Sequence, residues 1–299
     1  MRIFLTGATG FIGAALLGEL ISAGHEVVGL TRSEAGVRAI EAAGAVAYRG
    51  TLEDPESLRA GADAADAVIH TAFDHDFSRF VDNCAKDGRV IRALGQALAG
   101  SDRPLIITSG TGMGSPDHGA LAMENVFNPA HPNPRVVSEL TGAELLDAGI
   151  NLSVMRLPQV HDTRKQGLIT PLIDIFREKG VAAYVGEGRN RFSAGHLSDV
   201  VRLYRLAVER GNRGARYHAV AEEGIETRVI AEALGRGLGL PVISVPAEKA
   251  AEQFGWMSIF AGADMPASSA WTRKTLDWHP TGPTLMADLD AMDYGALAA

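Results

Sequence analysis

The chain has 299 residues, with 28 basic and 36 acidic side chains and a formal net charge of −8. Hydrophobic residues make up 46% of it, which is enough for a sizeable core and excludes a disordered chain. The acidic balance argues against nucleic acid or an anionic membrane as the main partner, and the single cysteine, Cys84, excludes an intramolecular disulfide framework.

Short apolar runs alternate with segments of helical spacing as far as residue 156. The predicted strands are 2–6, 26–31, 45–48, 67–70, 105–109 and 152–156, and the predicted helices are 11–23, 35–42, 55–60, 77–99 and 136–148. This alternation predicts an α/β fold with a doubly wound parallel sheet and helices on both faces. Because the strands are nearly continuous apolar runs, both faces of the sheet should be buried.

The pattern becomes irregular after residue 157. It predicts helices at 168–179, 199–210 and 226–238 and strands at 182–185 and 217–220, with a loop over a site at 254–269. We therefore expect residues 1–156 to form the sheet and residues 157–299 to form mostly a smaller C-terminal lobe over its carboxyl edge. No flexible linker separates these parts, so they should fold as one unit.

A glycine-rich turn follows the first predicted strand and reads Thr6-Gly7-Ala8-Thr9-Gly10-Phe11-Ile12-Gly13. Gly7 would allow a tight turn, Gly10 would let a pyrophosphate approach the backbone, and Gly13 would let the helix pack closely on the strand. The N–H groups and the dipole at the start of that helix would bind the phosphates. The turn therefore predicts a dinucleotide site formed by Gly7, Thr9, Gly10, Phe11, Ile12 and Gly13.

The end of the second predicted strand bears on the choice of cofactor. It reads Gly29-Leu30-Thr31-Arg32-Ser33 and lacks the carboxylate that would hold the ribose 2′-hydroxyl of NAD. A guanidinium matches a phosphate, so Arg32 and Ser33 favour NADP over NAD. The alternative is that Arg32 is a solvated surface residue.

Four stretches together resemble the extended short-chain dehydrogenase/reductases, which include the NAD-dependent epimerase/dehydratase family: TGATGFIG, ADAVIHTAF, ITSG and MRLPQVHD. The resemblance covers most of the chain, because RFSAGHLSDVVRLYRLAVERG also follows the family pattern. It implies a Rossmann-type sheet and a substrate lobe with a nicotinamide cofactor between them. It also implies that Leu52 lies near the adenine, Thr71, Ala72 and Phe73 along the ribose and pyrophosphate, and Pro158, Gln159 and Val160 by the nicotinamide.

The chain departs from the catalytic signature of that family, which is a tyrosine and a lysine four residues later, preceded by a serine or threonine after the fifth strand. Ser109 or Thr111 fills the serine position. The following helix reads Asn133-Pro134-Arg135-Val136-Val137-Ser138-Glu139, so Arg135 stands at the tyrosine position and Glu139 at the lysine position. The chain therefore resembles an atypical member without the usual proton-transfer pair.

Arg135 cannot replace the tyrosine in proton transfer because a guanidinium stays charged, but it could stabilise a developing alkoxide or enolate. Glu139 could accept hydrogen bonds from ribose hydroxyls. The alternative is a surface ion pair between these two residues, which are four apart on a helix. His161, after the sixth strand, could be a general acid or a satisfied loop histidine. Asp74 or His75 could contact a ligand.

The loop at 110–134, which contains His118, should border the pocket. Arg189 and Arg191 could pair with an anionic substrate group or lie in a solvated loop. We expect no metal site, because the histidines and aspartates of residues 70–76 lack the spacing of metal ligands.

Together these features favour an NADP-dependent oxidoreductase that transfers a hydride to or from a small carbonyl, alcohol or related compound. The alternatives are an epimerase or dehydratase, which recycles its cofactor, and a non-catalytic NADP-binding regulatory protein that senses redox state. The sequence names no substrate. The N-terminus lacks the features of a signal peptide and no window approaches a membrane span, so we expect a cytoplasmic protein.

The resemblance also bears on assembly, because in that family the helices expected at 77–99 and 136–148 pair with their copies in a four-helix bundle. The first of them carries a stripe of small and apolar residues, Val90, Leu94, Ala97 and Leu98. This stripe predicts a homodimer, and the alternative is that it packs only on the chain's own sheet.

Overall fold

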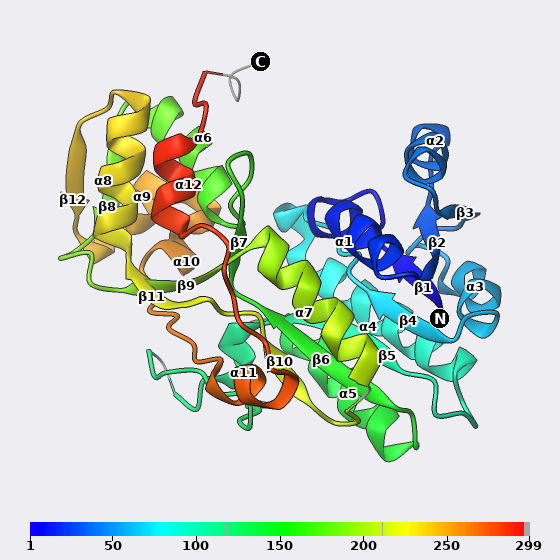
Figure 1. The fold of residues 1–299 in the computed structure, drawn as a ribbon. Coiled ribbons are helices and arrows are strands. Elements are labelled where there is room, and N and C mark those ends of the chain that lie inside the picture. Colours follow the sequence, from blue (N-terminus) through cyan, green and yellow to red (C-terminus); the bar gives the residue numbers. More distant parts are fainter. Residues whose placement is uncertain (118, 211, 296–299) are drawn as a thin grey trace.

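A computed structural model describes residues 1–117, 119–210 and 212–295. Its centre is a seven-stranded parallel sheet in the order β10-β6-β5-β4-β1-β2-β3 (Figure 1). The strands are β1 (Arg2–Thr6), β2 (Glu26–Thr31), β3 (Val46–Arg49), β4 (Ala67–His70), β5 (Leu105–Gly110), β6 (Leu152–Leu157) and β10 (Arg216–His218). The Rossmann-type doubly wound sheet expected from the sequence is confirmed.

Helices cover both faces of this sheet. One face carries α1 (Phe11–Ser22), α2 (Glu34–Ala42) and α7 (Leu197–Arg210), and the other carries α3 (Arg59–Asp63), α4 (Phe80–Ala97) and α5 (Val136–Asp147). Side chains alternate along a strand, so Ile3 and Leu5 join the core beneath α1 and α7, while Phe4 joins the core beneath α3 and α4. Burial of both faces explains the continuous apolar runs of the central strands.

The apolar stripe of α4 and its C-cap residue Leu98 lies within the core of this chain. Val90, Leu94 and Leu98 are fully buried against the sheet. At Gly95 a Cβ would collide with Leu145 of α5, so α4 and α5 pack closely within one chain. The stripe therefore packs on its own sheet and on α5 and offers no exposed apolar interface, while the homodimer stays a prediction.

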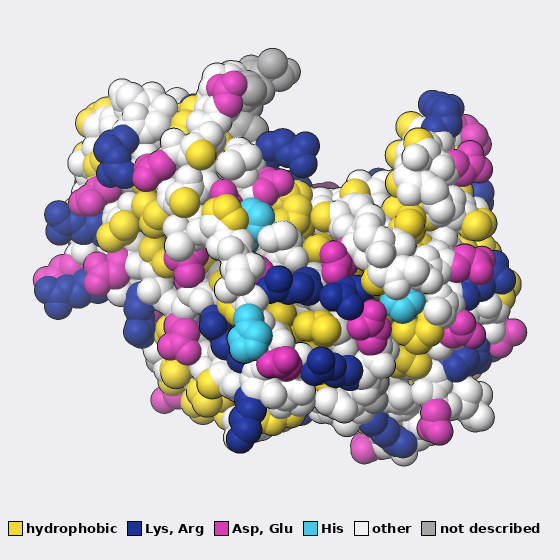
Figure 2. All heavy atoms as spheres, viewed as in Figure 1, with side chains coloured by type: hydrophobic (Ala, Val, Ile, Leu, Met, Phe, Trp, Pro, Cys, Tyr) yellow, Lys and Arg dark blue, Asp and Glu magenta, His cyan; other side chains and the backbone are white. Residues whose placement is uncertain are grey.

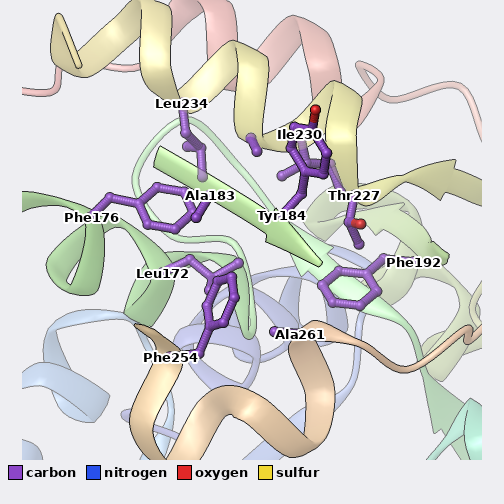
Figure 3. A pocket seen from close by; sticks show the side chains of 11 residues that line it. Leu172, Phe176, Ala183, Tyr184, Phe192, Thr227, Ile230, Leu234, Phe254 and Ala261 are labelled. Carbon is purple, nitrogen blue, oxygen red and sulfur yellow. The ribbon is translucent and has the colours of Figure 1, made fainter. Parts of the chain in front are cut away.

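The C-terminal lobe has its own sheets and its own core. Strands β7 (Gln159–His161), β9 (Arg191–His196) and β11 (Glu222–Glu226) form one sheet, and β8 (Ala182–Val185) pairs with β12 (Val242–Val245). The helices are α6 (Ile169–Lys179), α8 (Thr227–Leu238), α9 (Ala250–Phe254), α10 (Ser258–Ala261) and α12 (Leu285–Ala291). Figure 3 shows Phe176, Leu234 and Phe254 pointing toward one another from three of these helices.

The chain passes between the sheet and the lobe several times. After β6 it enters the lobe, returns to the sheet for α7 and β10, and returns again for α11 (Ala270–Leu276). The buried Trp278 then packs with the α7 side of the core and donates its indole N–H to the carbonyl of Asp199 at 3.0 Å. The lobe therefore consists of separate segments of residues 157–299.

Residues 254–269 differ from the loop that the sequence predicts. A 3-10 turn (Gly255–Met257) and α10 occupy the first part, and Met257 and Phe260 are buried in the lobe core. In the part of the chain that the structure describes, no helix is both long and apolar enough to cross a membrane.

Candidate active site

A cleft of about 1800 Å³ lies between the carboxyl edge of the large sheet and the C-terminal lobe. Figure 2 shows the surface hollowed between these two parts. The strand order reverses at β1, because β2 lies on one side of it and β4 on the other, and doubly wound sheets bind ligands outside such a switch point. Since pockets for one small ligand usually measure about 300–1,000 Å³, this cleft has room for two ligands.

The glycine-rich turn forms one wall of the cleft at the start of α1. Gly7 has a φ of +73°, and a Cβ on Gly13 would collide with the carbonyl of Gly7. Gly10, the N-cap of α1, makes no side-chain capping hydrogen bond, and the first turn contains no acidic residue. The helix N-terminus is therefore free to bind an anionic diphosphate. All the turn residues expected from the sequence line the cleft: Gly7, Thr9, Gly10, Phe11, Ile12 and Gly13.

The end of β4 is tied to this turn by hydrogen bonds. The Thr71 hydroxyl donates to the carbonyl of Thr6 at 2.7 Å, and the N–H of Ala72 donates to Thr6 Oγ1 at 3.3 Å. These bonds hold the segment after β4 beside the glycine-rich turn. Thr71, Ala72 and Phe73 all line the cleft, as do Pro158, Gln159 and Val160 from the lobe side.

Arg32, Ser33 and Leu52 line the cleft near the ends of β2 and β3. Ser33 Oγ accepts a hydrogen bond from the N–H of Gly36 at 3.1 Å and caps α2. Arg32 is exposed, and its side chain forms no hydrogen bond or ion pair with any residue that the structure describes. Its guanidinium is therefore available for an anion.

Lys86 forms ion pairs with two carboxylates at the rim of the cleft. Its Nζ lies 2.8 Å from Glu53 and 2.8 Å from Asp74. The hydrogen bond from Lys86, with one from Thr51, lowers the pKa of Glu53 to about 2, and Lys86 also lowers the pKa of Asp74. Asp74, a candidate ligand contact, is thus held in the wall of the cleft by an ion pair.

Ser109 and Thr111 line the opposite end of the cleft, at the end of β5. They are only 4% and 6% exposed. The buried Oγ of Ser109 has no hydrogen-bond partner among the described residues. A buried hydroxyl without a partner costs stability, so this atom is suited to bind a polar atom of a ligand.

Arg135 brings a fixed positive charge to the same end. Its Nη1 lies 2.7 Å from Asp87 Oδ2, its Nη2 donates to the carbonyl of Thr108 at 3.0 Å, and its guanidinium lies 3.9 Å above the ring of Phe73. The side chain is 13% exposed and lines the cleft. A cation held by three partners can stabilise negative charge with little rearrangement.

Asp87 anchors Arg135 from inside the core. It also accepts hydrogen bonds from His70 Nε2 at 3.1 Å and from Ser138 Oγ at 2.7 Å. Burial by itself would raise the pKa of Asp87, but the charge of Arg135 and these two hydrogen bonds hold the pKa below its usual value. His70 Nδ1 is in turn 2.7 Å from Thr6 Oγ1, so two buried hydrogen bonds and the Asp87–Arg135 ion pair join the glycine-rich turn to Arg135.

Glu139 lies outside the cleft. It is buried, and its carboxylate is bound by Arg156 through two hydrogen bonds of 2.8 Å and by Arg216 Nε at 3.1 Å. The surface ion pair between Arg135 and Glu139 is not formed, because each has a different buried partner. Glu139 serves as the counter-ion of the fully buried Arg156, so the expected contact with ribose hydroxyls is wrong.

His161 also lies away from the cleft, although its neighbours in β7 line it. The ring is fully buried in the lobe, with Nδ1 at 2.6 Å from Asp288 Oδ2 of α12. Burial lowers the pKa of His161, although Asp288 opposes this shift. The expectation of a general acid in the cleft is therefore wrong. The alternative of a satisfied loop histidine does not hold either, because His161 lies in a strand and its buried Nε2 has no hydrogen-bond partner among the described residues.

Two other histidines, His75 and His131, line the cleft. Nδ1 of His131 accepts a hydrogen bond from the N–H of Asn133 at 3.1 Å, which leaves Nε2 as the N–H donor of the neutral ring. Nε2 lies 3.9 Å from the position that a Cβ on Gly112 would take, so this donor is beside the turn that follows Ser109. Burial lowers the pKa of His131 and favours the neutral form.

Other candidates lie elsewhere. Arg189 and Arg191 do not line the cleft and pair with Glu187 and Asp264, while His118 lies outside the described residues. His131 lies in the loop at 110–134 that was expected to border the pocket, but no motif in the sequence distinguishes it. The sequence analysis missed Lys165, whose Nζ lies 5.8 Å from the centroid of the Phe11 ring across the cleft.

Comparison with known proteins agrees with this architecture. Residues 3–221 match the model of the NAD dependent epimerase/dehydratase family. An uncharacterized protein of Schizosaccharomyces pombe is 46% identical over 98% of this chain and 100% of its own length. A 4-hydroxy-2-methyl-3-oxo-4-farnesyl-3,4-dihydroquinoline-1-oxide ketoreductase of Stigmatella aurantiaca is 28% identical over 89% of this chain and 84% of its own. The UDP-glucose 4-epimerase of Thermus thermophilus in complex with NAD superimposes with a TM-score of 0.75 at 18% identity, covering 97% of each chain.

Proposed function

Because the chain belongs to the NAD-dependent epimerase/dehydratase family, we propose that it is an NADP-dependent oxidoreductase that transfers a hydride to or from a small carbonyl or alcohol compound. One observation carries this proposal: a single cleft has an open helix N-terminus and a free Arg32 at one end, and the unpartnered hydroxyl of Ser109 beside Arg135 at the other. The name of the Stigmatella aurantiaca relative, a ketoreductase, favours a ketone as the compound that is reduced.

The preference for NADP rests on Arg32 and Ser33, because the structural relative from Thermus thermophilus carries NAD. Arg32 would bind the 2′-phosphate, and the N-terminus of α1 would bind the diphosphate. Pro158, Gln159 and Val160 would border the nicotinamide. When bound, the cofactor supplies or accepts the hydride.

Three groups at the end of β5 would hold the reacting oxygen of the substrate. Ser109 Oγ and His131 Nε2 would donate hydrogen bonds to it, and Arg135 would stabilise the negative charge that develops there. None of the chain's five tyrosines lines the cleft, and an arginine does not transfer its proton. Because His161, the other proton donor considered, lies outside the cleft, we propose that water in the cleft supplies the proton for the oxygen.

The absence of tyrosine from the cleft lining also favours a second candidate, an NADP-binding regulatory protein without turnover. Cofactor turnover separates the possibilities. Net consumption of NADPH with a carbonyl compound supports the reductase, and product without net consumption supports an epimerase or dehydratase. Tight binding of NADPH without turnover across a broad panel of carbonyl compounds supports the regulator.

Arg32→Ala tests the cofactor proposal. Loss of a charge-assisted contact should weaken NADPH binding by about 1.5–3 kcal/mol, which is about 10- to 150-fold in Kd, and should leave NADH binding nearly unchanged. Isothermal titration calorimetry measures both constants. Arg59→Ala is the control, because Arg59 is exposed and lies outside the cleft. An equal loss for both cofactors would contradict the role of Arg32.

A further inference from the structure

The cleft has an aromatic wall that begins at Arg135 and ends at the lobe. The guanidinium of Arg135 covers Phe73, whose ring centroid is 6.2 Å from that of Phe80. Phe80 is 5.5 Å from Phe77, and Phe77 stacks on Trp256 at 4.5 Å with an interplanar angle of 15°. The wall therefore starts at the reacting end of the cleft and is formed by side chains from both the sheet and the lobe.

Part of this aromatic wall is open to solvent. Trp256 is 44% exposed, and the neighbouring Ile259 is 67% exposed and also lines the cleft. Exposed apolar surface gathered inside a cleft is typical of a ligand-binding surface, because a ligand that covers it removes it from water. Flat rings gain further stabilisation from stacking on Trp and Phe.

The charges on the lobe side of the cleft do not suit a substrate with a diphosphate. Among the lining residues that the structure describes from residue 157 onward, Lys165 is the single cation, against Asp174 and Asp264. Asp264 is held by Arg191 through hydrogen bonds of 3.0 and 2.7 Å, and Arg191 does not line the cleft. A diphosphate is bound most strongly by several cationic donors, so this surface favours a neutral molecule.

We propose that the carbonyl substrate is a neutral compound with a flat, fused-ring body that packs on Phe77, Trp256 and Ile259, with its carbonyl group at Ser109 and Arg135. This proposal rests on the oxidoreductase function proposed above. In the reduction, the carbonyl carbon gains a hydride from NADPH and the oxygen gains a proton from water, so NADPH is oxidised and the ketone becomes an alcohol.

Isothermal titration calorimetry on the full chain saturated with NADPH tests the ring-binding surface separately from the chemistry. The probes are 2-naphthol, which contains fused rings and no reducible carbonyl, acetoin, a small acyclic hydroxyketone, and UDP-glucose, which carries a diphosphate. We expect 2-naphthol to bind at least tenfold more tightly than acetoin or UDP-glucose. Equal or tighter binding of UDP-glucose would overturn the proposal.

Substitutions in the wall locate the binding surface. Trp256→Ala should weaken the binding of 2-naphthol about tenfold, because one aromatic contact and the apolar area that it buries are lost. NADPH binding should be unchanged. Trp271→Ala is the matched control: Trp271 is also 44% exposed and stacks on Tyr217 at 5.7 Å, but it lies outside the cleft. Ile259→Asp, at a position exposed enough to accept a charge, should weaken the binding of 2-naphthol by a similar factor. Unchanged 2-naphthol affinity in both cleft variants would overturn the proposal.

Activity separates this inference from the function on which it rests. Oxidation of NADPH with 2-acetonaphthone, at a kcat/KM at least tenfold above that for acetoin and about tenfold lower in Trp256→Ala, would support both. If 2-naphthol binds through Trp256 and no carbonyl compound is reduced, the oxidoreductase function fails and the ring-binding surface stands. If acetoin is reduced more efficiently than 2-acetonaphthone, the function stands and the substrate class proposed here is wrong.

Discussion

Glu139 occupies the position at which the resembled family carries a lysine. We predict that its carboxylate is an essential buried counter-ion, and Glu139→Gln tests this role. The carboxylate is the shared counter-ion of Arg156 and Arg216, at 2.8 and 3.1 Å. The side chains of Glu139 and Arg156 are 0% exposed, and that of Arg216 is 21% exposed. Glutamine keeps the shape and removes the negative charge, so the substitution leaves two neighbouring guanidinium groups without their anion.

The size of the effect follows from this burial. Removing one partner of a buried ion pair costs about 3–5 kcal/mol, because the remaining charge stays away from water. The entropy of unfolding is about 2.1 cal/mol/K per residue, or about 0.6 kcal/mol/K for this chain, so Tm should fall by about 5–8 °C. Glu139→Lys, which restores the family's residue, should destabilise the chain further because it adds a third cation.

Urea unfolding followed by circular dichroism, together with thermal melting, measures the effect. Glu144→Gln is the matched control on the same helix, α5, because Glu144 pairs with Arg92 at 2.7 Å and these side chains are 62% and 45% exposed. An exposed pair contributes about 1 kcal/mol or less. If Glu139→Gln lowers the free energy of unfolding no more than Glu144→Gln does, then Glu139 is not an essential buried counter-ion and our reasoning is wrong.

Four further predictions concern the active site, the pH dependence of activity and of stability, and assembly. Asp87→Asn removes the anion that anchors Arg135, so it should lower kcat at least tenfold with little change in NADPH affinity; an unchanged kcat would show that Arg135 is held without it. Burial lowers the pKa of His131, and protonation of Nδ1 would break the hydrogen bond that it accepts from the N–H of Asn133 and displace the ring. We therefore expect kcat/KM to fall as pH drops through that lowered pKa, and His131→Gln, which keeps an N–H donor but does not titrate, should remove this acid limb from the pH profile. Burial and then the charge of Arg156 lower the pKa of His218 from 6.5 to about 3. Between about pH 6.5 and pH 3, His218 therefore binds a proton in the unfolded chain but not in the folded chain. The free energy of unfolding should fall as pH drops through this range, by at most about 1.4 kcal/mol per pH unit. The free energy of unfolding at pH 7 and pH 5 should therefore differ more in the wild type than in His218→Gln, and equal differences would contradict the shift. We also expect a homodimer, so light scattering that gives the 31.5 kDa mass of one chain at working concentration would refute it.

The sequence by itself determined the large sheet and the glycine-rich turn that lines one end of the cleft. Continuous apolar runs marked the strands because both faces of a parallel sheet are buried. The turn from Thr6 to Gly13 is formed by neighbours along the chain, so it could be recognised without tertiary contacts. The sequence marked Arg32 as a candidate, and the structure showed that it is unpaired among the described residues and lines the cleft. Among the lobe strands, the pattern predicted β8 at 182–185, whereas β7, β9, β11 and β12 escaped prediction because they are short or lack a regular pattern, as in β11, whose sequence EEGIE pairs with β9 only in the folded chain.

Only the tertiary structure decided which polar residues reach the cleft. His161 lies outside the cleft, hydrogen-bonded to Asp288, which is 127 positions away in the sequence. Glu139 also lies outside the cleft, bound to Arg156 on β6 and Arg216 on β10. Arg135 lines the cleft, where it pairs with Asp87 of α4, and His131 lines the cleft from an irregular loop. A buried charge must find an opposite charge, and the partner that folding places beside it can come from any part of the chain. Local spacing therefore identified Arg135, Glu139 and His161 as candidates, and their long-range partners determined that the cleft retains only Arg135.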